Sequence, residues 1–363
     1  ATHTHTAPTC AGVFQSEPDP EYTRFLTTRI ADAVARALNN LAPARIGWGK
    51  GQEPNQVFNR RWKMKAGAIP PNPFDGTNDQ VRMNPPIASP DLIEPAGPTD
   101  PEIAVVSVQT ADGRPLALLA NYSLHYVGTT QGNDISADYF GVFADRIQQL
   151  LGADRLDPPF VALLANGASG DINNINFRQK RPPSGPYDQM RAVADAIATE
   201  TCRVCQNLQY RNWVPLGARQ TELNLGVRKP SQTEVLHAEA LLATANQPLK
   251  TPQQIYARET LLLRDFPDQV PLILQVLRIG DLGIAAIPCE VFAEIGLEIK
   301  QRSPLAQTFI IELANGYNGY LPTPAQHRLG GYETWRARSS YLETEASPKI
   351  VSEILNLLNS LAE

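Results

Sequence analysis

The chain has 363 residues, of which 42% are hydrophobic and 19% are charged, so it can form a large core and is not a disordered chain. Its formal net charge of −5 argues against a surface that binds nucleic acid or anionic lipid. No apolar run approaches the roughly 18 residues of a membrane span, and four cysteines are too few for a disulfide scaffold.

The first predicted helix runs from about Glu21 to Leu41, with Asp19 as its cap and Pro20 at its first position. Its apolar residues form one stripe at helical spacing: Tyr22, Phe25, Leu26, Ile30, Ala33, Val34, Ala37 and Leu38. We expect this stripe to face the core. In residues 66–101, nine prolines predict a long loop without regular elements, packed down as a rim or lid.

From residue 103 onward, β-rich runs alternate with helical patterns. The predicted strands are Ile103–Gln109, Pro115–Tyr122, Phe160–Ala165, a hairpin over Pro271–Ile287, and Thr308–Leu313. The predicted helices are Phe140–Leu151, Tyr187–Leu208, Gln232–Phe266 with a break at Pro252, Val291–Arg302, and a last helix that begins at Ser347. This order predicts an α/β fold, with a mixed β-sheet core covered by helices.

Two of the five histidines, His3 and His5, lie in a Thr-His-Thr-His-Thr run. In a strand, residues two apart point the same way, so both imidazoles can face one metal site. The alternative is a polar terminus or the remnant of a tag. His125 ends a predicted strand, where α/β enzymes place functional groups, although a core histidine would also fit.

Glu290 lies near the start of a helix, where it is either a capping acid or a functional carboxylate. A glycine-rich turn after the next strand carries Tyr317 and Tyr320, and Tyr332 follows twelve residues later. Residues 165–174 are rich in small residues that allow close backbone approach to a ligand, or simply a tight turn. They match neither a P-loop nor a nucleophile elbow.

In chain order, these pieces resemble the catalytic domain of the neutral/alkaline, non-lysosomal ceramidase family, from Ala1 to about Ala346. The ordered set is Thr-His-Thr-His, Asn59-Arg60, His125, Ser136-Ala137-Asp138, Gly170-Asp171, Ile287-Pro288-x-Glu290, Asn-x-Tyr-x-x-Tyr320 and Tyr332-Glu333. The family fold is an α/β domain, often followed by a small β-sandwich. The resemblance therefore implies that residues 1–363 form one catalytic domain, a divergent relative without the sandwich and with its start missing.

The resemblance implies a zinc ion and a hydrolase that cleaves the amide bond of an N-acyl, ceramide-like lipid. The implied zinc ligands are His3, His125, Glu290 and Tyr320; the residues implied around the scissile amide are His5, Arg60 and Tyr332. These types agree with the chemistry: zinc prefers imidazole and carboxylate, a dication favours a phenolate, and bound water acidifies into a nucleophile. Tyr332 would donate to the oxyanion. Relatives are mostly exported, which implies a secreted or periplasmic protein.

One departure from the family pattern bears on the mechanism. The family serine that lies two residues after the aspartate is replaced here by Asn173, while Asp171 is kept. Asparagine can form hydrogen bonds but cannot be a nucleophile. If water is the nucleophile, the protein is an enzyme; if a serine is required, it is a non-catalytic metal- or ligand-binding relative. A zinc hydrolase of another ester or amide is the third possibility.

Overall fold

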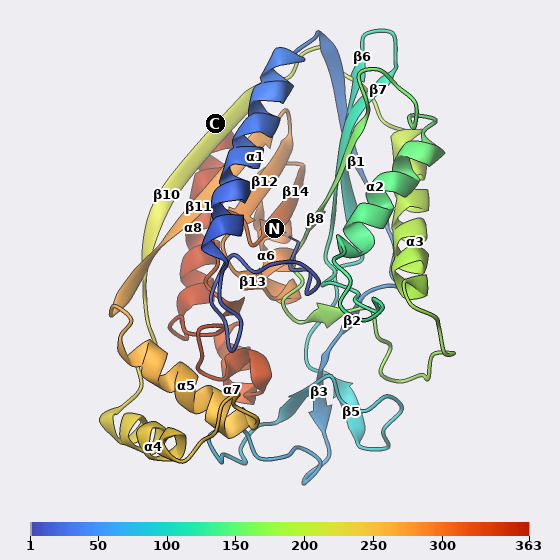
Figure 1. Cartoon of the computed structure of the whole chain (residues 1–363). Helices are drawn as coiled ribbons and strands as arrows, with labels where there is room; N and C mark the ends of the chain where they lie inside the picture. Colours follow the sequence, from blue (N-terminus) through green and yellow to red (C-terminus); the bar gives the residue numbers. More distant parts are fainter. Residues whose placement is uncertain (1, 363) are drawn as a thin grey trace.

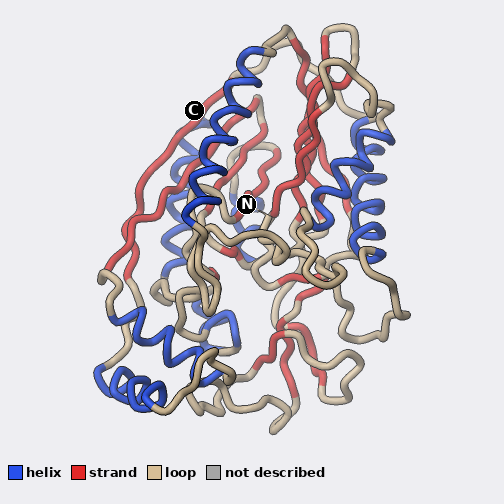
Figure 2. The backbone as a smooth tube through the Cα atoms, viewed as in Figure 1, coloured by secondary structure: helices blue, strands red, loops and turns tan. Residues whose placement is uncertain are grey.

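The computed structural model describes residues 2–362, and two four-stranded sheets form its centre (Figures 1 and 2). The first sheet has the order β1-β6-β7-β8, with β1 Ala44–Gln52, β6 Glu102–Thr110, β7 Pro115–Tyr122 and β8 Val161–Asn166. The second has the order β10-β11-β12-β14, with β10 Leu216–Gly226, β11 Gln269–Ile279, β12 Leu282–Ile287 and β14 Gln307–Glu312. In each sheet one pair is parallel, β7–β8 and β12–β14, and the other pairs are antiparallel. The predicted mixed α/β class is thus confirmed.

Helices cover the outer face of each sheet. Helices α2 (Asp138–Leu150) and α3 (Asp188–Cys205) share a core with the first sheet, and α6 (Ala293–Arg302) and α8 (Ala346–Ala362) share one with the second. Helices α4 (Gln232–Ala243) and α5 (Pro252–Arg264) pack on each other at one end of the molecule (Figure 1). Between the sheets, a third cluster joins β6 to β12 and β14: Ala104, Val106, Leu282, Ile284 and Phe309.

Three small sheets hold a few of the motif residues, among them Asn59, Asn173, Glu290 and Tyr320. Strand β2 (Phe58–Asn59) pairs with β9 (Ile172–Asn173), and β13 (Glu290–Val291) pairs in parallel with β15 (Tyr320–Leu321). Strand β3 (Arg61–Met64) lies between β4 (Val81–Met83) and β5 (Leu92–Pro95). A short helix α7 (Pro324–Leu329) and a 3₁₀ turn (Tyr332–Thr334) follow β15.

The proline-rich segment 66–101 departs from expectation, because β4 and β5 both lie within it. Strand β4 contains no proline. In β5 the one proline, Pro95, is the last residue of an edge strand, where a missing backbone N–H is tolerated. The prediction that this segment has no regular element was therefore wrong, although most of it is loop.

The first helix, α1 (Pro20–Asn39), begins as predicted, with the Asp19 carboxylate accepting from Glu21 N and Tyr22 N. Its apolar stripe does not face the core: α1 contains no buried residue, and Ile30 and Leu38 are 56% and 60% exposed. That prediction was wrong because periodicity shows which side chains share a face and not whether another element covers it. Among the described residues, no helix combines the length and hydropathy needed to cross a membrane.

Candidate metal centre

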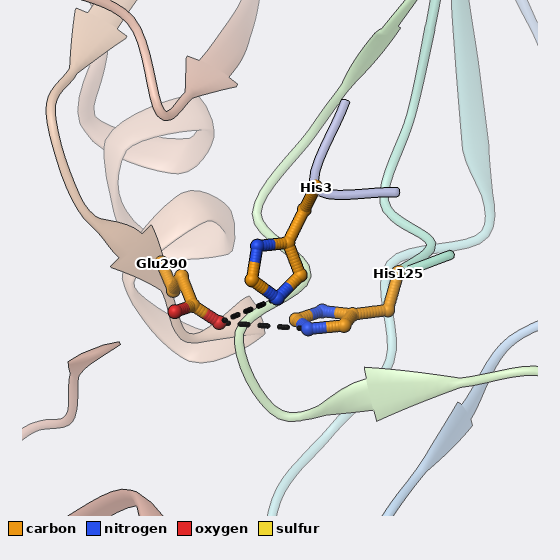
Figure 3. Close-up of side chains that lie close together, drawn as sticks. All are labelled: His3, His125 and Glu290. Atoms are coloured by element: carbon orange, nitrogen blue, oxygen red, sulfur yellow. Dashed lines mark ion pairs between the residues drawn. The ribbon is translucent and has the colours of Figure 1, made fainter. Parts of the chain in front are cut away.

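Three of the four residues implied as zinc ligands meet at one point. His3 belongs to the N-terminal segment, His125 lies just beyond β7, and Glu290 begins β13 (Figure 3). The Oε2 atom of Glu290 lies 3.5 Å from Nε2 of His3 and 3.5 Å from Nε2 of His125. The three ligand atoms all lie within 4.8 Å of one another, so one small cation can contact all of them.

The chemistry and spacing of this group fit zinc. Glu290 is 1% exposed, and among the described residues its Oε2 atom has no hydrogen-bond partner. A buried carboxylate oxygen without a donor is unfavourable unless a cation binds it. Tetrahedral zinc with ligands at about 2.0–2.2 Å has ligand–ligand separations of roughly 3.3–3.6 Å. The two 3.5 Å separations lie in that range.

Both histidines are neutral and His125 is held by the backbone. Nδ1 of His125 lies 2.9 Å from the carbonyl oxygen of Ser169, which can only accept, so Nδ1 carries the proton and Nε2 presents its lone pair to the centre. Burial, with a smaller effect of Arg60, lowers the pKa of His3 to about 4. The same causes hold the pKa of His125 well below its usual value. Neutral imidazole is the form that binds a metal.

Glu290 is also in contact with the tyrosine turn. The hydroxyl of Tyr317 donates to its Oε1 atom at 3.2 Å, and Tyr320 lies beside it in the β13–β15 pair. Burial raises the pKa of Glu290 to about 7, against the opposite effect of Arg60. Burial also raises the pKa of the Tyr320 phenol; a bound dication would act in the opposite direction.

Arg60 lies beside Tyr320, and its guanidinium forms hydrogen bonds with three groups of the protein. Its Nη2 donates to the Tyr320 hydroxyl at 3.0 Å and to the Gly170 carbonyl at 2.9 Å, and its Nε donates to Glu333 at 2.9 Å. Arg61 donates to the other oxygen of Glu333 at 2.6 Å. These contacts give Arg60 a position beside the tyrosine ligand candidate.

His5 lies next to the three-residue group without joining it. Its Nε2 is 3.3 Å from Nε2 of His3, and its ring stacks on Tyr126 with 3.8 Å between centroids. Burial, with a smaller effect of the neighbouring His3, lowers the pKa of His5 to about 4. The N-terminal segment that carries His3 and His5 is held by Ser136. The Ser136 carbonyl accepts from the Thr6 hydroxyl at 3.0 Å, and its N–H donates to the Thr6 carbonyl.

Asp171 and Asn173 hold neighbouring backbone in place. Asp171 accepts from Ala293 N at 2.8 Å and from Asn59 Nδ2 at 2.7 Å. Asn173 donates to Asn84 at 2.6 Å and accepts from Ile175 N at 2.9 Å. Within residues 2–362, neither side chain is hydrogen bonded to His3, His125 or Glu290.

Gly170 brings the turn before Asp171 against β13. Its N–H donates to the Val291 carbonyl at 2.8 Å, and a Cβ atom on this residue would lie 2.5 Å from the Glu290 carbonyl oxygen. Glycine is therefore required here for close backbone approach. Tyr332 completes the surroundings, with its ring 5.9 Å from that of Tyr320.

Four contacting residues were absent from the predicted site: Tyr126, Ser169, Glu312 and Tyr317. Tyr317 shares the glycine-rich turn with Tyr320, so its spacing was a usable signal. Tyr126 follows His125 directly. Ser169 acts through its carbonyl and hydroxyl, and Glu312 through its carboxylate, in contacts between distant segments that no local pattern reveals.

No family model and no curated protein matches this sequence. The solved structures that match this chain include two that do so over 99% of its length. One is the neutral ceramidase from Pseudomonas aeruginosa, with a TM-score of 0.67 and 17% sequence identity. The other is described as ceramidase complexed with C2, with a TM-score of 0.68 and 16% sequence identity.

The geometry defines the chain as a mixed α/β protein with a candidate metal centre. The similarity to the two solved structures shows more narrowly that the chain has the neutral ceramidase fold. The resemblance is thereby confirmed at the level of the fold. The chain spans about 60% of the length of these ceramidases. That residues 1–363 form one catalytic domain stays a prediction.

Proposed function

We propose that this protein is a zinc-dependent hydrolase that cleaves the amide bond of an N-acyl, ceramide-like substrate. The observation that carries the proposal is the Oε2 atom of Glu290, which has no hydrogen-bond partner within residues 2–362 and faces two neutral imidazoles at zinc-like spacing. The neutral ceramidase fold supports the choice of an amide as the substrate.

The proposed ligands are His3, His125 and Glu290, with the Tyr320 phenolate as the fourth. When bound, zinc would supply Lewis-acid chemistry, polarising a carbonyl group and acidifying water. The chain supplies the orientation: the Ser169 carbonyl fixes the His125 ring, and Arg60 fixes the Tyr320 hydroxyl.

Tyr332 is proposed to donate a hydrogen bond to the substrate oxygen that gains negative charge. Burial raises the pKa of its phenol, so the proton needed for donation is retained at neutral pH. His5, stacked on Tyr126 and adjacent to His3, is placed to hold a water molecule or a substrate hydroxyl.

Asn173 supports water as the nucleophile. Both ends of its amide are engaged, with Asn84 and with Ile175 N, and an amide cannot attack a carbonyl carbon. Asp171 is likewise engaged with backbone and Asn59, so we assign it the role of holding the turn.

Asn173 also favours a second candidate, a relative that binds metal or ligand without turnover. A zinc hydrolase of a different ester or amide is the third. By the same family resemblance we propose a secreted or periplasmic location, which fractionation of expressing cells would test.

Elemental analysis after expression with zinc tests the centre: we expect about one zinc per chain. His125→Ala should lower zinc occupancy sharply while the far-UV circular dichroism spectrum stays native. His237→Ala, on exposed α4 surface, is the matched control and should keep full occupancy. Full zinc in His125→Ala would show that His125 is structural.

Turnover is tested with a panel of N-acyl amides and esters, using zinc-loaded and chelated protein. Zinc-dependent hydrolysis that survives Asn173→Ala supports water as the nucleophile. Binding of panel members without zinc-dependent turnover would favour the non-catalytic relative.

A further inference from the structure

We infer that Glu312 is a positioning residue that fixes the relative placement of His125 and Glu290; this role rests on the proposed metal centre. Glu312 is the last residue of β14 and is completely buried. It is not one of the proposed ligands. Its role follows from the three hydrogen bonds that its carboxylate accepts.

These bonds come from two separate segments. One oxygen, Oε1, accepts from the hydroxyl of Ser169, in the turn that follows β8. The other, Oε2, accepts from the N–H of Ser169 at 3.2 Å and from the N–H of Val291, in β13, at 2.7 Å. The carboxylate therefore joins the turn to β13.

Each donor lies next to a ligand candidate or its support. The carbonyl of Ser169 accepts the Nδ1 proton of His125, and Val291 directly follows Glu290. A shift of either segment would change the 3.5 Å separation between His125 Nε2 and Glu290 Oε2. Glu312 holds both segments, so it controls that separation.

Packing alone does not explain an acid at this position. Neighbours in the same strand, such as Phe309 and Ile310, are apolar and buried. Among the described residues, Glu312 forms no ion pair with a lysine, arginine or histidine, so three hydrogen bonds are what offset the burial of its polar atoms.

Glu259, in α5, is a matched control. It is also completely buried, and it accepts from the backbone N–H and the guanidinium of Arg338. It has no hydrogen bond to Ser169, Val291 or a proposed ligand within the part of the chain that the structure describes. Glu259→Gln therefore reports the general effect of removing a buried carboxylate.

The first measurement needs no metal. In metal-free protein with ¹⁵N-labelled histidine, NMR detects the Nδ1 proton of His125, assigned by its loss in His125→Ala. In Glu312→Gln the amide oxygen can still accept from the two N–H groups, but it carries no charge, and the NH₂ group cannot accept from the Ser169 hydroxyl. The bonds to the turn are therefore weakened or rearranged, so Glu312→Gln should shift this resonance or speed its exchange with water. Glu259→Gln should leave it unchanged.

The second measurement is zinc affinity by competition with a chelator. Glu312→Gln should bind zinc about 10–100-fold more weakly, and Glu259→Gln within about twofold of the unmodified chain. An unchanged His125 resonance together with unchanged zinc affinity in Glu312→Gln would overturn the positioning role. An equal loss of affinity in Glu259→Gln would also overturn it.

The two proposals fail in different ways. If the unmodified chain binds no zinc but the His125 resonance still responds to Glu312→Gln alone, the metal centre fails and the positioning role stands. If Glu312→Gln does not fold, Ser169→Ala replaces it, because this variant removes only the hydroxyl donor. It should move the same resonance, and an unmoved resonance would contradict the proposal.

Discussion

Two buried polar clusters adjoin in this molecule, and they are completed in different ways. In the cluster of Arg60, Arg61 and Glu333, each oxygen of Glu333 binds a guanidinium, at 2.9 and 2.6 Å. In the candidate metal centre, one oxygen of Glu290 faces two neutral imidazoles and receives no donor from the described residues. The first cluster is satisfied by the chain itself, whereas the second has the unsatisfied acceptor expected of a site that binds a cation.

The largest expected effect is on stability, in the first cluster. Glu333→Ala leaves two buried guanidinium groups without their carboxylate, which should lower the free energy of unfolding by about 3–5 kcal/mol. Urea unfolding measures the change. The control is Glu94→Ala, which breaks an exposed pair with Lys63 and should leave the unfolding midpoint unchanged. A small effect of Glu333→Ala would remove the distinction between the clusters.

The next largest effect is on catalysis, through Tyr332, which lies next to the candidate metal centre. Tyr332→Phe removes one proposed oxyanion donor and should lower kcat by roughly 10²–10³ on whichever amide the panel identifies. Zinc content and unfolding should stay unchanged, since the ring and its contacts are kept. A kcat close to that of the unmodified enzyme would exclude Tyr332 as the donor.

Zinc affinity should depend on pH through Glu290 and Tyr320. Burial raises the pKa of this carboxyl to about 7, whereas His3 has a pKa of about 4 and is neutral throughout the range above pH 5. Below pH 7 zinc must displace the protons of both Glu290 and the Tyr320 phenol, whose pKa burial raises. Affinity should therefore rise about 100-fold per pH unit from 5 to 7 and about tenfold per unit above 7, where only the phenol proton is released. Isothermal titration calorimetry across this range measures it, and a flat profile would contradict the pKa shift.

The smallest expected effect is a pH dependence of the stability of the metal-free chain, which comes from Glu290. Because folding raises the pKa of Glu290 from 4.5 to about 7, the folded metal-free chain binds this proton more tightly than the unfolded chain. The Glu290 contribution to stability is therefore lost as pH rises from 4.5 to 7. Glu290→Gln has no such loss, so at pH 8 it should be at least as stable as the unmodified metal-free chain. Thermal unfolding of the two chains at pH 5 and pH 8 tests this.

The order of residue types along the whole chain contributed more to the prediction of the site than the local spacing between residues did. His3, His125 and Glu290 were chosen through the family resemblance, and the structure brings them together. The interpretation of Glu290 as a helix cap or of His125 as a core residue was equally open from the sequence. Glu312 could not be found in this way, because its donors come from segments far away along the chain.

The fold shows the same limit in its helices. Helices α1 and α8 both carry an apolar stripe, and α8 buries Ile350 and Ile354 against the second sheet as a core helix does. Helix α1 buries none of its residues. The patterns of the two helices are alike, so the difference depends on which elements the chain folding brings against them, and that information is not local.

The origin of the three candidate ligands has a consequence for how the whole chain responds to metal. They come from the N-terminal segment, the end of the first sheet and the short β13 strand beyond the second, so the centre exists only when all three parts are in place. A bound ion would then act as a reversible cross-link between them. By linkage, free zinc at 100 times its dissociation constant would stabilise the entire fold by about 2.7 kcal/mol. A chelator would thus weaken the molecule globally, and its unfolding temperature would become a gauge of free zinc.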